Sequence, residues 1–252
     1  MTVGSNAPAW LTARPIAHRG LHDRAGGIPE NTLAAARAAI AGGYAIECDV
    51  QISADGEAMV FHDEALGRLT GAVALVAETR TDALRSLAVA GSSETIPTLP
   101  GTLAAIAGRV PLVVEVKSRF TGDLRLVERV AAIVAEYDGP VAVKSFDPAL
   151  IEAFAGLAPR IPRGIVGETS QDDPAYALMT ESLRHSLANL LHLEASRPDF
   201  LSWRVDDLPC AATFLSRHLG RMPVMTWTVR NPDQRQRAHE HADQMVFEGF
   251  RP

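Results

Sequence analysis

Short apolar runs rich in β-branched residues alternate with Ala- and Leu-rich stretches along the chain, and this alternation constrains the fold more than any other feature. Strands that alternate with helices form βα units, which build a parallel sheet covered by helices. The predicted strands are Pro15–Gly20, Ala45–Ser53, Glu57–Asp63, Pro111–Ser118, Pro140–Phe146, Pro162–Gly167, Phe200–Val205, Val224–Val229 and Gln244–Glu248. The predicted helices are Asn31–Ala41, Leu124–Tyr137, Pro148–Leu157, Ala175–Leu191, Leu208–Leu219 and Pro232–His241.

The dipeptide Asp55-Gly56 lies between two of the apolar runs, where Asp-Gly is a strong signal for a β-hairpin. If Glu57–Asp63 folds back on the strand before it, eight parallel strands remain, which is the number in a (β/α)8 barrel. The sequence therefore predicts an α/β fold, a TIM-type (β/α)8 barrel with a β-hairpin arm after the second strand. A doubly wound sheet is the weaker alternative, because no Gly-x-Gly-x-x-Gly follows the first strand.

The length of 252 residues suits one such barrel, since ~250 residues are typical. We expect a single domain over residues 1–252, with an inserted connection at about residues 64–110. This connection contains a Ser-, Gly- and Pro-rich patch at Gly91–Pro100. We expect it to form helices and a loop over one end of the barrel.

The composition narrows the class of protein. Apolar residues make up 47% of the chain, which argues against disorder. The net charge of −6 argues against a protein that binds nucleic acid or anionic membranes. Two cysteines, Cys48 and Cys210, form neither a disulfide framework nor a metal-type spacing. No secretory signal and no membrane-spanning run is visible, so the expected location is cytoplasmic and the expected partner a small molecule.

The second predicted strand carries two carboxylates on one face. Glu47 and Asp49 are two residues apart, whereas Cys48 faces the opposite side. Such a pair on an apolar strand is costly unless something neutralises it, although a pair at a solvated strand end is the plain alternative. With a two-residue turn at Asp55-Gly56, the hairpin register places His62 opposite Asp49. A histidine beside two carboxylates is a metal ligand or an acid/base group.

The mouth of the predicted barrel collects further charged residues. Glu115 and Lys117 share one face at the end of a very apolar strand, where an inward ion pair is the plain alternative, and His18 and Arg19 end the first strand. Barrel enzymes place their active sites at these carboxyl ends. Three carboxylates suit Mg²⁺ or Ca²⁺ better than Zn²⁺ as a bound cation. The two histidines can serve as a general acid and a general base. The Arg and Lys side chains suit binding of a phosphate. These residues point to metal-assisted phosphoester chemistry.

The motifs IAHRG, PENT, ECDVQISADGEAMVFHDEALGRLTG, IPTL, VVEVKS, VKSFDP and WTV occur in an order that resembles the glycerophosphodiester phosphodiesterase family. The resemblance runs from about residue 15 to residue 229 and is most specific over residues 16–71. It implies a TIM barrel, one divalent cation, and hydrolysis of glycerophosphodiesters to glycerol 3-phosphate and an alcohol. It places the acid/base pair on His18 and His62, the cation ligands on Glu47, Asp49 and Glu115, phosphate contacts on Arg19 and Lys117, and a pocket aromatic on Trp227.

Several positions depart from the family pattern. Pro100 lies where family members often have Glu, Arg230 replaces an Asn, and Glu248 lies where the last strand usually has Asp. We expect these departures to lie away from the proposed ligands and histidines, and to affect the substrate pocket more than the chemistry. We expect His22 to be solvated, and Glu30 to begin a helix or anchor the loop of His18.

Two other functions remain open at this point. A related phospholipase D-like lyase on lysophospholipids would keep the same histidines and metal, and a catalytically inactive binding barrel would lack one of the five central residues. The attacking group is either water or the glycerol 2-hydroxyl, the latter through a cyclic phosphate. We assign His62 as base, because the predicted register places it beside Asp49, and His18 as acid.

Overall fold

The computed structural model describes residues 7–171, 176 and 179–252. Eight parallel strands form a closed barrel, because β1 pairs with both β9 and β2. The predicted TIM-type (β/α)8 barrel is therefore confirmed. The barrel strands are β1 (Ile16–Ala17), β2 (Ala45–Ile52), β4 (Leu112–Val116), β5 (Val141–Ser145), β6 (Arg163–Gly167), β7 (Phe200–Arg204), β8 (Val224–Val229) and β9 (Gln244–Phe247).

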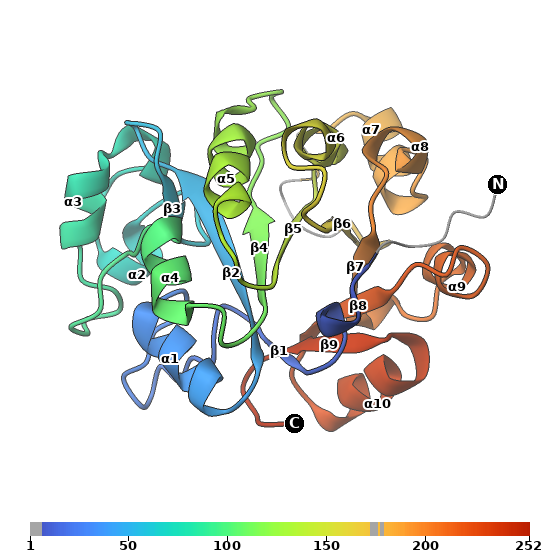
Figure 1. Ribbon diagram of the computed structural model, residues 1–252, viewed down its shortest axis with the longest axis horizontal. Coiled ribbons are helices and arrows are strands. Elements are labelled where there is room, and N and C mark those ends of the chain that lie inside the picture. The colour runs from blue at the N-terminus through green and yellow to red at the C-terminus, as the bar shows by residue number, and fades with distance from the viewer. Residues whose placement is uncertain (1–6, 172–175, 177–178) are drawn as a thin grey trace.

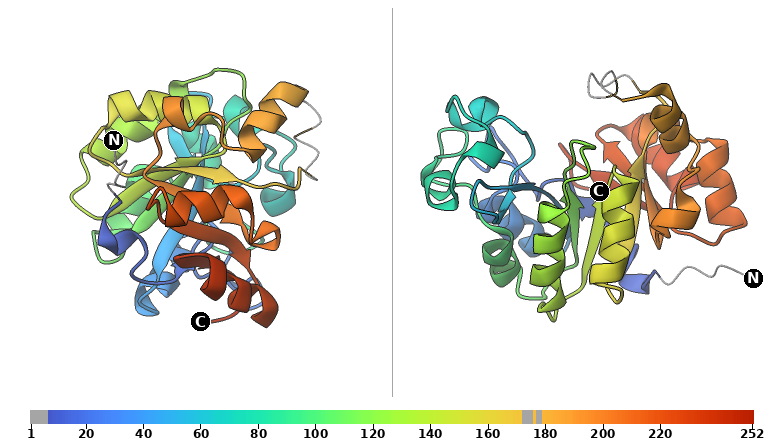
Figure 2. Two further views of the ribbon diagram at one scale, coloured as in Figure 1. Left: turned by 90° about the vertical axis from the view of Figure 1, so that its right-hand side faces the viewer. Right: turned by 90° about the horizontal axis from the view of Figure 1, so that it is seen from above.

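Helices surround the strands (Figures 1 and 2). They are α1 (Leu33–Ala41), α2 (Gly67–Thr70), α3 (Thr81–Ser86), α4 (Leu99–Ile106), α5 (Arg125–Ala135), α6 (Pro148–Leu157), α7 (Glu181–Ala188), α8 (Leu193–Ser196), α9 (Ala211–His218) and α10 (Pro232–His241). Helices α6 and α10 begin and end as predicted, since each has Pro in its first turn and a capping side chain before it. The single helix predicted over Ala175–Leu191 is wrong: α7 and α8 occupy its described part and the residues after it, and Ala175 lies outside the described residues.

The hairpin arm is present, but its predicted register is wrong by one residue. Strand β3 (Ala58–Val60) pairs antiparallel with β2, with Val60 opposite Val50. The turn has three residues rather than two, because the Ser53 N–H donates to the Glu57 carbonyl at 2.9 Å. Gly56 has φ +85°, which is the left-handed position of a three-residue hairpin loop.

A contact from outside the hairpin stabilises this longer turn. Asp55 accepts hydrogen bonds from the Ser53 hydroxyl and from both the amide and the hydroxyl of Thr81. As a result Asp49 lies opposite Phe61, whose N–H donates to the Asp49 carbonyl at 3.0 Å. His62 follows the end of β3 rather than lying in the strand.

The barrel interior is built in layers, because alternate residues of each strand point inward. The lowest layer is apolar and takes one residue from each of seven strands, with Leu11 below them: Ile16, Ala45, Val113, Ala142, Phe200, Met225 and Val246. Gly164 on β6 leaves room for the Phe200 ring, since a Cβ there would lie 2.3 Å from it. Two residues further along these strands the side chains are polar, except for Trp227 on β8: His18, Glu47, Glu115, Lys144, Ser202 and Glu248. The barrel therefore has an apolar floor and a charged mouth.

The connection after β3 forms a small core of its own. Residues from Met59 to Ile96 pack together around Leu84, and the segment lies at the left edge in Figure 1. Helix α4, within the predicted insertion, instead packs against the barrel helices α1 and α5. Pro100 lies in the first turn of α4, away from the charged mouth.

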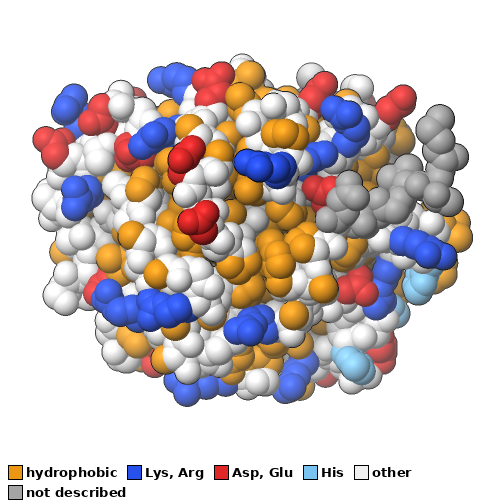
Figure 3. Space-filling view, viewed as in Figure 1, with side chains coloured by type: hydrophobic (Ala, Val, Ile, Leu, Met, Phe, Trp, Pro, Cys, Tyr) orange, Lys and Arg blue, Asp and Glu red, His pale blue; other side chains and the backbone are white. Residues whose placement is uncertain are grey.

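Within the described ranges, no helix combines the length and the apolar character that a membrane crossing needs. On the face in Figure 3, Lys and Arg side chains are interspersed with Asp and Glu, and neither sign forms a continuous field.

Candidate active site

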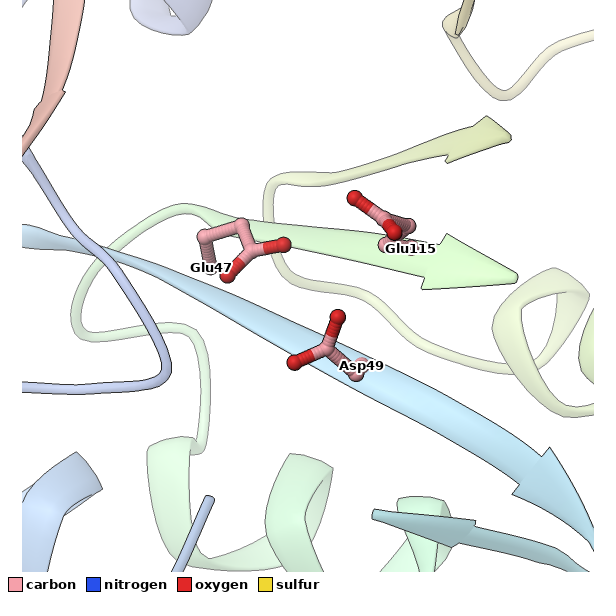
Figure 4. A group of neighbouring side chains, drawn as sticks. All are labelled: Glu47, Asp49 and Glu115. Carbon is pink, nitrogen blue, oxygen red and sulfur yellow. The ribbon is translucent and has the colours of Figure 1, made fainter. Parts of the chain in front are cut away.

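Three carboxylates converge near the carboxyl ends of β2 and β4. Glu47 and Asp49 point into the barrel from β2, and Glu115 on β4 lies in register with Asp49. Each offers an oxygen within 4.8 Å of the other two, and all three residues are buried. Figure 4 shows the three side chains pointing toward one another. The sequence-based expectation that these residues come together is met.

Two lysines, the buried Lys144 and the half-buried Lys117, bridge the carboxylates. Lys117 Nζ lies 2.7 Å from Asp49 Oδ1 and also contacts Glu115, and Lys144 Nζ lies 3.1 Å from Glu47 Oε1 and 3.0 Å from Glu115 Oε2. The sequence analysis missed Lys144. Strand alternation could have found it, because Lys144 lies two residues after the inward-facing Ala142.

Lys117 and Lys144 keep Glu115 ionised. Burial alone would raise the pKa of Glu115, but Lys117 and Lys144 lower it to about 2. Burial alone would lower the pKa of Lys117, but Asp49 and Glu115 raise it above its usual value. The cluster therefore carries fixed charges of both signs at neutral pH.

The donor set fits a divalent cation. All the available ligand atoms are carboxylate oxygens, which Mg²⁺ and Ca²⁺ prefer. Glu47 Oε1 is buried and accepts no hydrogen bond, although it is close to Lys144. A buried carboxylate oxygen that accepts no hydrogen bond can serve as a metal ligand.

Arg19 and Asn31 hold the carboxylate cluster from the first βα loop. Both residues have φ +56°, a strained conformation that clusters at functional sites. The Arg19 amide donates to Glu47 Oε2 at 3.1 Å, and its guanidinium lies between Asp49 and Glu30. The Asn31 side chain donates to Asp49 Oδ2 at 2.9 Å and accepts from the Asp49 amide.

Three residues of the PENT motif have different roles. Thr32 rather than Asn31 caps α1, by accepting from the Ala35 amide. Glu30 pairs with Arg19 and Arg68, so it anchors the loop that follows His18, as expected. Asn31, which the sequence analysis placed only at the start of a predicted helix, is a site residue because its side chain binds Asp49.

His18 lies at the end of β1 and is nearly buried. Its Nδ1 lies 2.5 Å from Glu248 Oε2, and its Nε2 faces Glu47 Oε2 at 4.0 Å. Arg230 pairs with the other oxygen of Glu248, Oε1. The expectation that Arg230 and Glu248 lie away from the histidines is wrong, because barrel closure places β9 beside β1. His22 also lies 3.6 Å from Glu248, so it is not a freely solvated residue.

His62 is held in a similar way at the other side of the mouth. Its Nδ1 lies 2.7 Å from Asp63 Oδ1, and Arg68 binds both oxygens of Asp63. His62 and Asp49 line the same cavity, but they are not the cross-strand neighbours that the sequence predicted, because Asp49 lies opposite Phe61.

A cavity of about 940 Å³ joins these groups. Both histidines, Lys117 and Trp227 line it. Trp227 is half-buried, donates from Nε1 to the Ser202 carbonyl at 2.9 Å, and meets Phe146 edge to face at 5.5 Å. The mouth thus combines a carboxylate cluster, two oriented imidazoles, cationic side chains and an aromatic wall.

Lys144→Met provides a test of the charge balance in this cluster. The substitution leaves Glu47 and Glu115 without one of their buried cations, and breaking a buried pair in this way costs about 3–5 kcal/mol. We expect the free energy of unfolding, measured by urea titration in EDTA, to fall by about that amount. If the cluster binds Mg²⁺, saturating Mg²⁺ should restore part of this free energy, because an ion that binds only the folded state stabilises that state. The exposed Arg125→Met is the control and should leave stability nearly unchanged. Full stability of Lys144→Met in EDTA would contradict this account.

Comparisons with known proteins found a matching family and similar folds. The model of the glycerophosphoryl diester phosphodiesterase family matches residues 18–247. A glycerophosphodiester phosphodiesterase of Caldanaerobacter subterraneus is 30% identical over 170 residues, which are 63% of this chain and 68% of that protein. The structure of an Oleispira antarctica phosphodiesterase in complex with the product sn-glycerol-3-phosphate is similar, with a TM-score of 0.76, 24% identity and 94% of each chain covered. A Thermotoga maritima glycerophosphodiester phosphodiesterase has a TM-score of 0.70 at 22% identity, with 92% of each chain covered.

Proposed function

This chain belongs to the glycerophosphoryl diester phosphodiesterase family and is an enzyme of that class; from this premise we propose that it hydrolyses glycerophosphodiesters to glycerol 3-phosphate and an alcohol, and that the reaction requires a divalent cation. The observation that carries the proposal is the position of three converging carboxylates beside two carboxylate-bound histidines. The product proposed here is the compound bound in the Oleispira antarctica phosphodiesterase.

Glu47, Asp49 and Glu115 would hold the cation, either Mg²⁺ or Ca²⁺. When bound, it would supply positive charge for a phosphate oxygen and lower the pKa of an attacking hydroxyl or water. Asn31 and Lys117 would keep Asp49 oriented, since both bind its carboxylate in the structure.

His62 would act as the base and His18 as the acid. The predicted register does not support this assignment, because Asp49 lies opposite Phe61 rather than His62. His18 also faces a carboxylate of the cluster, Glu47, at 4.0 Å. A second observation supports the same assignment. The His62 side chain is 32% exposed and that of His18 is 10% exposed, so incoming water has readier access to His62.

Arg19 and Lys117 would contact the phosphate and balance its charge during transfer. Both reach the cluster in the structure, Arg19 through Asp49 and Lys117 through Asp49 and Glu115. Trp227 would form part of the wall against which the substrate packs, a role that its place in the cavity supports.

A substrate panel tests this function. Glycerophosphocholine, glycerophosphoethanolamine, glycerophosphoglycerol and a lysophospholipid would be incubated with Mg²⁺, Mn²⁺ or Ca²⁺ and followed by ³¹P NMR. We expect glycerol 3-phosphate from at least one glycerophosphodiester. Turnover of the lysophospholipid alone, with a cyclic phosphate as the end product, would favour the lyase instead.

A further inference from the structure

We propose that Glu248 is the positioning residue of His18: it binds Nδ1 of the imidazole and thereby commits Nε2 to the proton transfer at the barrel mouth. This inference rests on the proposed function, because it assumes that His18 moves a proton. Glu248 lies one residue beyond the segment that matches the family model, so that match does not include it.

The first support is the contact itself. Glu248 Oε2 lies 2.5 Å from His18 Nδ1, whereas His18 Nε2 points toward Glu47 in the cation-binding cluster. An ionised carboxylate can only accept a hydrogen bond, so Nδ1 must carry the proton of this bond. The nitrogen left to give or take a proton is then Nε2, on the side of the carboxylate cluster.

The second support is the way in which Glu248 is itself held. Arg230, after the end of β8, binds Oε1 of Glu248, whereas Oε2 faces His18 Nδ1 at 2.5 Å and His22 Nε2 at 3.6 Å. The Arg230 amide is in turn tied to Gln234 Oε1 at 2.8 Å. The carboxylate is therefore fixed from a neighbouring strand, and His18 is fixed by the carboxylate.

The third support is the repetition of the arrangement at His62. Asp63 binds Nδ1 of His62 and is held by Arg68, just as Glu248 binds Nδ1 of His18 and is held by Arg230. The two groups come from different parts of the chain, since Asp63 adjoins its histidine and Glu248 is 230 residues from its own. A carboxylate that orients an imidazole and stabilises its protonated form is a general device in proton transfer.

A double-mutant cycle tests the proposal. The kcat/KM for glycerophosphocholine would be measured for Glu248→Gln, His18→Ala and the double variant, all in saturating cation. We expect Glu248→Gln to lower kcat by ~10- to 100-fold with little change in KM, because orientation affects the transfer step rather than binding. In the His18→Ala background the same change should cost less than ~2-fold, since a group that acts only through His18 has nothing left to orient. Glu248→Asp should recover part of the lost activity.

Two further variants serve as controls. Glu240→Gln removes another carboxylate that faces a histidine, His241 at 3.6 Å, but on α10 outside the cavity, and should retain full activity. Asp63→Asn should affect activity through His62 instead, so its cost should persist in the His18→Ala background.

The outcomes separate this inference from the proposed function. An equal loss from Glu248→Gln with and without His18, or no loss at all, would overturn the positioning role while His18→Ala still shows that the histidine matters. Full activity of His18→Ala would overturn the histidine chemistry itself. Thermal melting and calorimetric cation affinity, measured on each variant, show whether a loss comes from unfolding or from a damaged metal site.

Discussion

Replacing Glu115 by Gln is expected to lower kcat/KM for a glycerophosphodiester by ~10²- to 10³-fold, and Glu47→Gln and Asp49→Asn should act similarly. Each change keeps the shape of the side chain and removes one of three charges that would hold the cation. The positive charge supplied by a bound metal is worth several kcal/mol at the transition state, and each 1.36 kcal/mol is about tenfold in rate.

The cation affinity of these variants, measured by calorimetry, should fall together with the activity. Glu128→Gln, an exposed change on α5, is the matched control and should leave both quantities unchanged. Each amide also leaves a lysine short of a partner, so the melting temperature of each variant must be measured. A folded variant with normal activity and normal affinity would remove that residue from the proposed ligand set.

The two histidines are expected to respond differently to the leaving group. A general acid matters most for a poor leaving group such as the alkoxide of choline, whereas a nitrophenolate leaves without a proton. His18→Ala should therefore cost more, by ~10²-fold or greater, on glycerophosphocholine than on a nitrophenyl ester of glycerol phosphate.

His62→Ala should lower the rates for both substrates about equally, because each still needs an activated nucleophile. If His62→Ala rather than His18→Ala affects glycerophosphocholine more than the nitrophenyl ester, the two roles are exchanged. If both variants affect the two substrates in the same proportion, the division between acid and base is refuted. Glu248→Gln should share the selectivity of His18→Ala, whichever role His18 has.

The barrel and its three converging carboxylates could be predicted because they depend on local patterns. Alternation along β2 and β4 is enough to turn Glu47, Asp49 and Glu115 inward, and the βα units fix which strand ends meet. The same alternation, applied to β5, would also have found Lys144.

Other features depend on contacts between distant segments, and local patterns cannot predict them. Asp-Gly occurs in both two- and three-residue hairpin turns, and here the contact between Asp55 and Thr81 accompanies the longer one. The contact between His18 and Glu248 exists only once the barrel closes and β9 lies beside β1. Asn31 begins the predicted helix Asn31–Ala41, and only the fold shows that its side-chain amide binds Asp49.

The central claim is that the carboxylate cluster binds a divalent cation on which turnover depends. The most direct measurement strips the enzyme with a chelator, removes the chelator, and titrates Mg²⁺ or Ca²⁺ while following both binding heat and release of glycerol 3-phosphate. We predict no turnover before the ion is added, and activity that saturates with the same midpoint as binding, with both curves shifted to higher concentration in Asp49→Asn. Full turnover by the stripped enzyme, or binding that saturates without any effect on rate, would contradict the account.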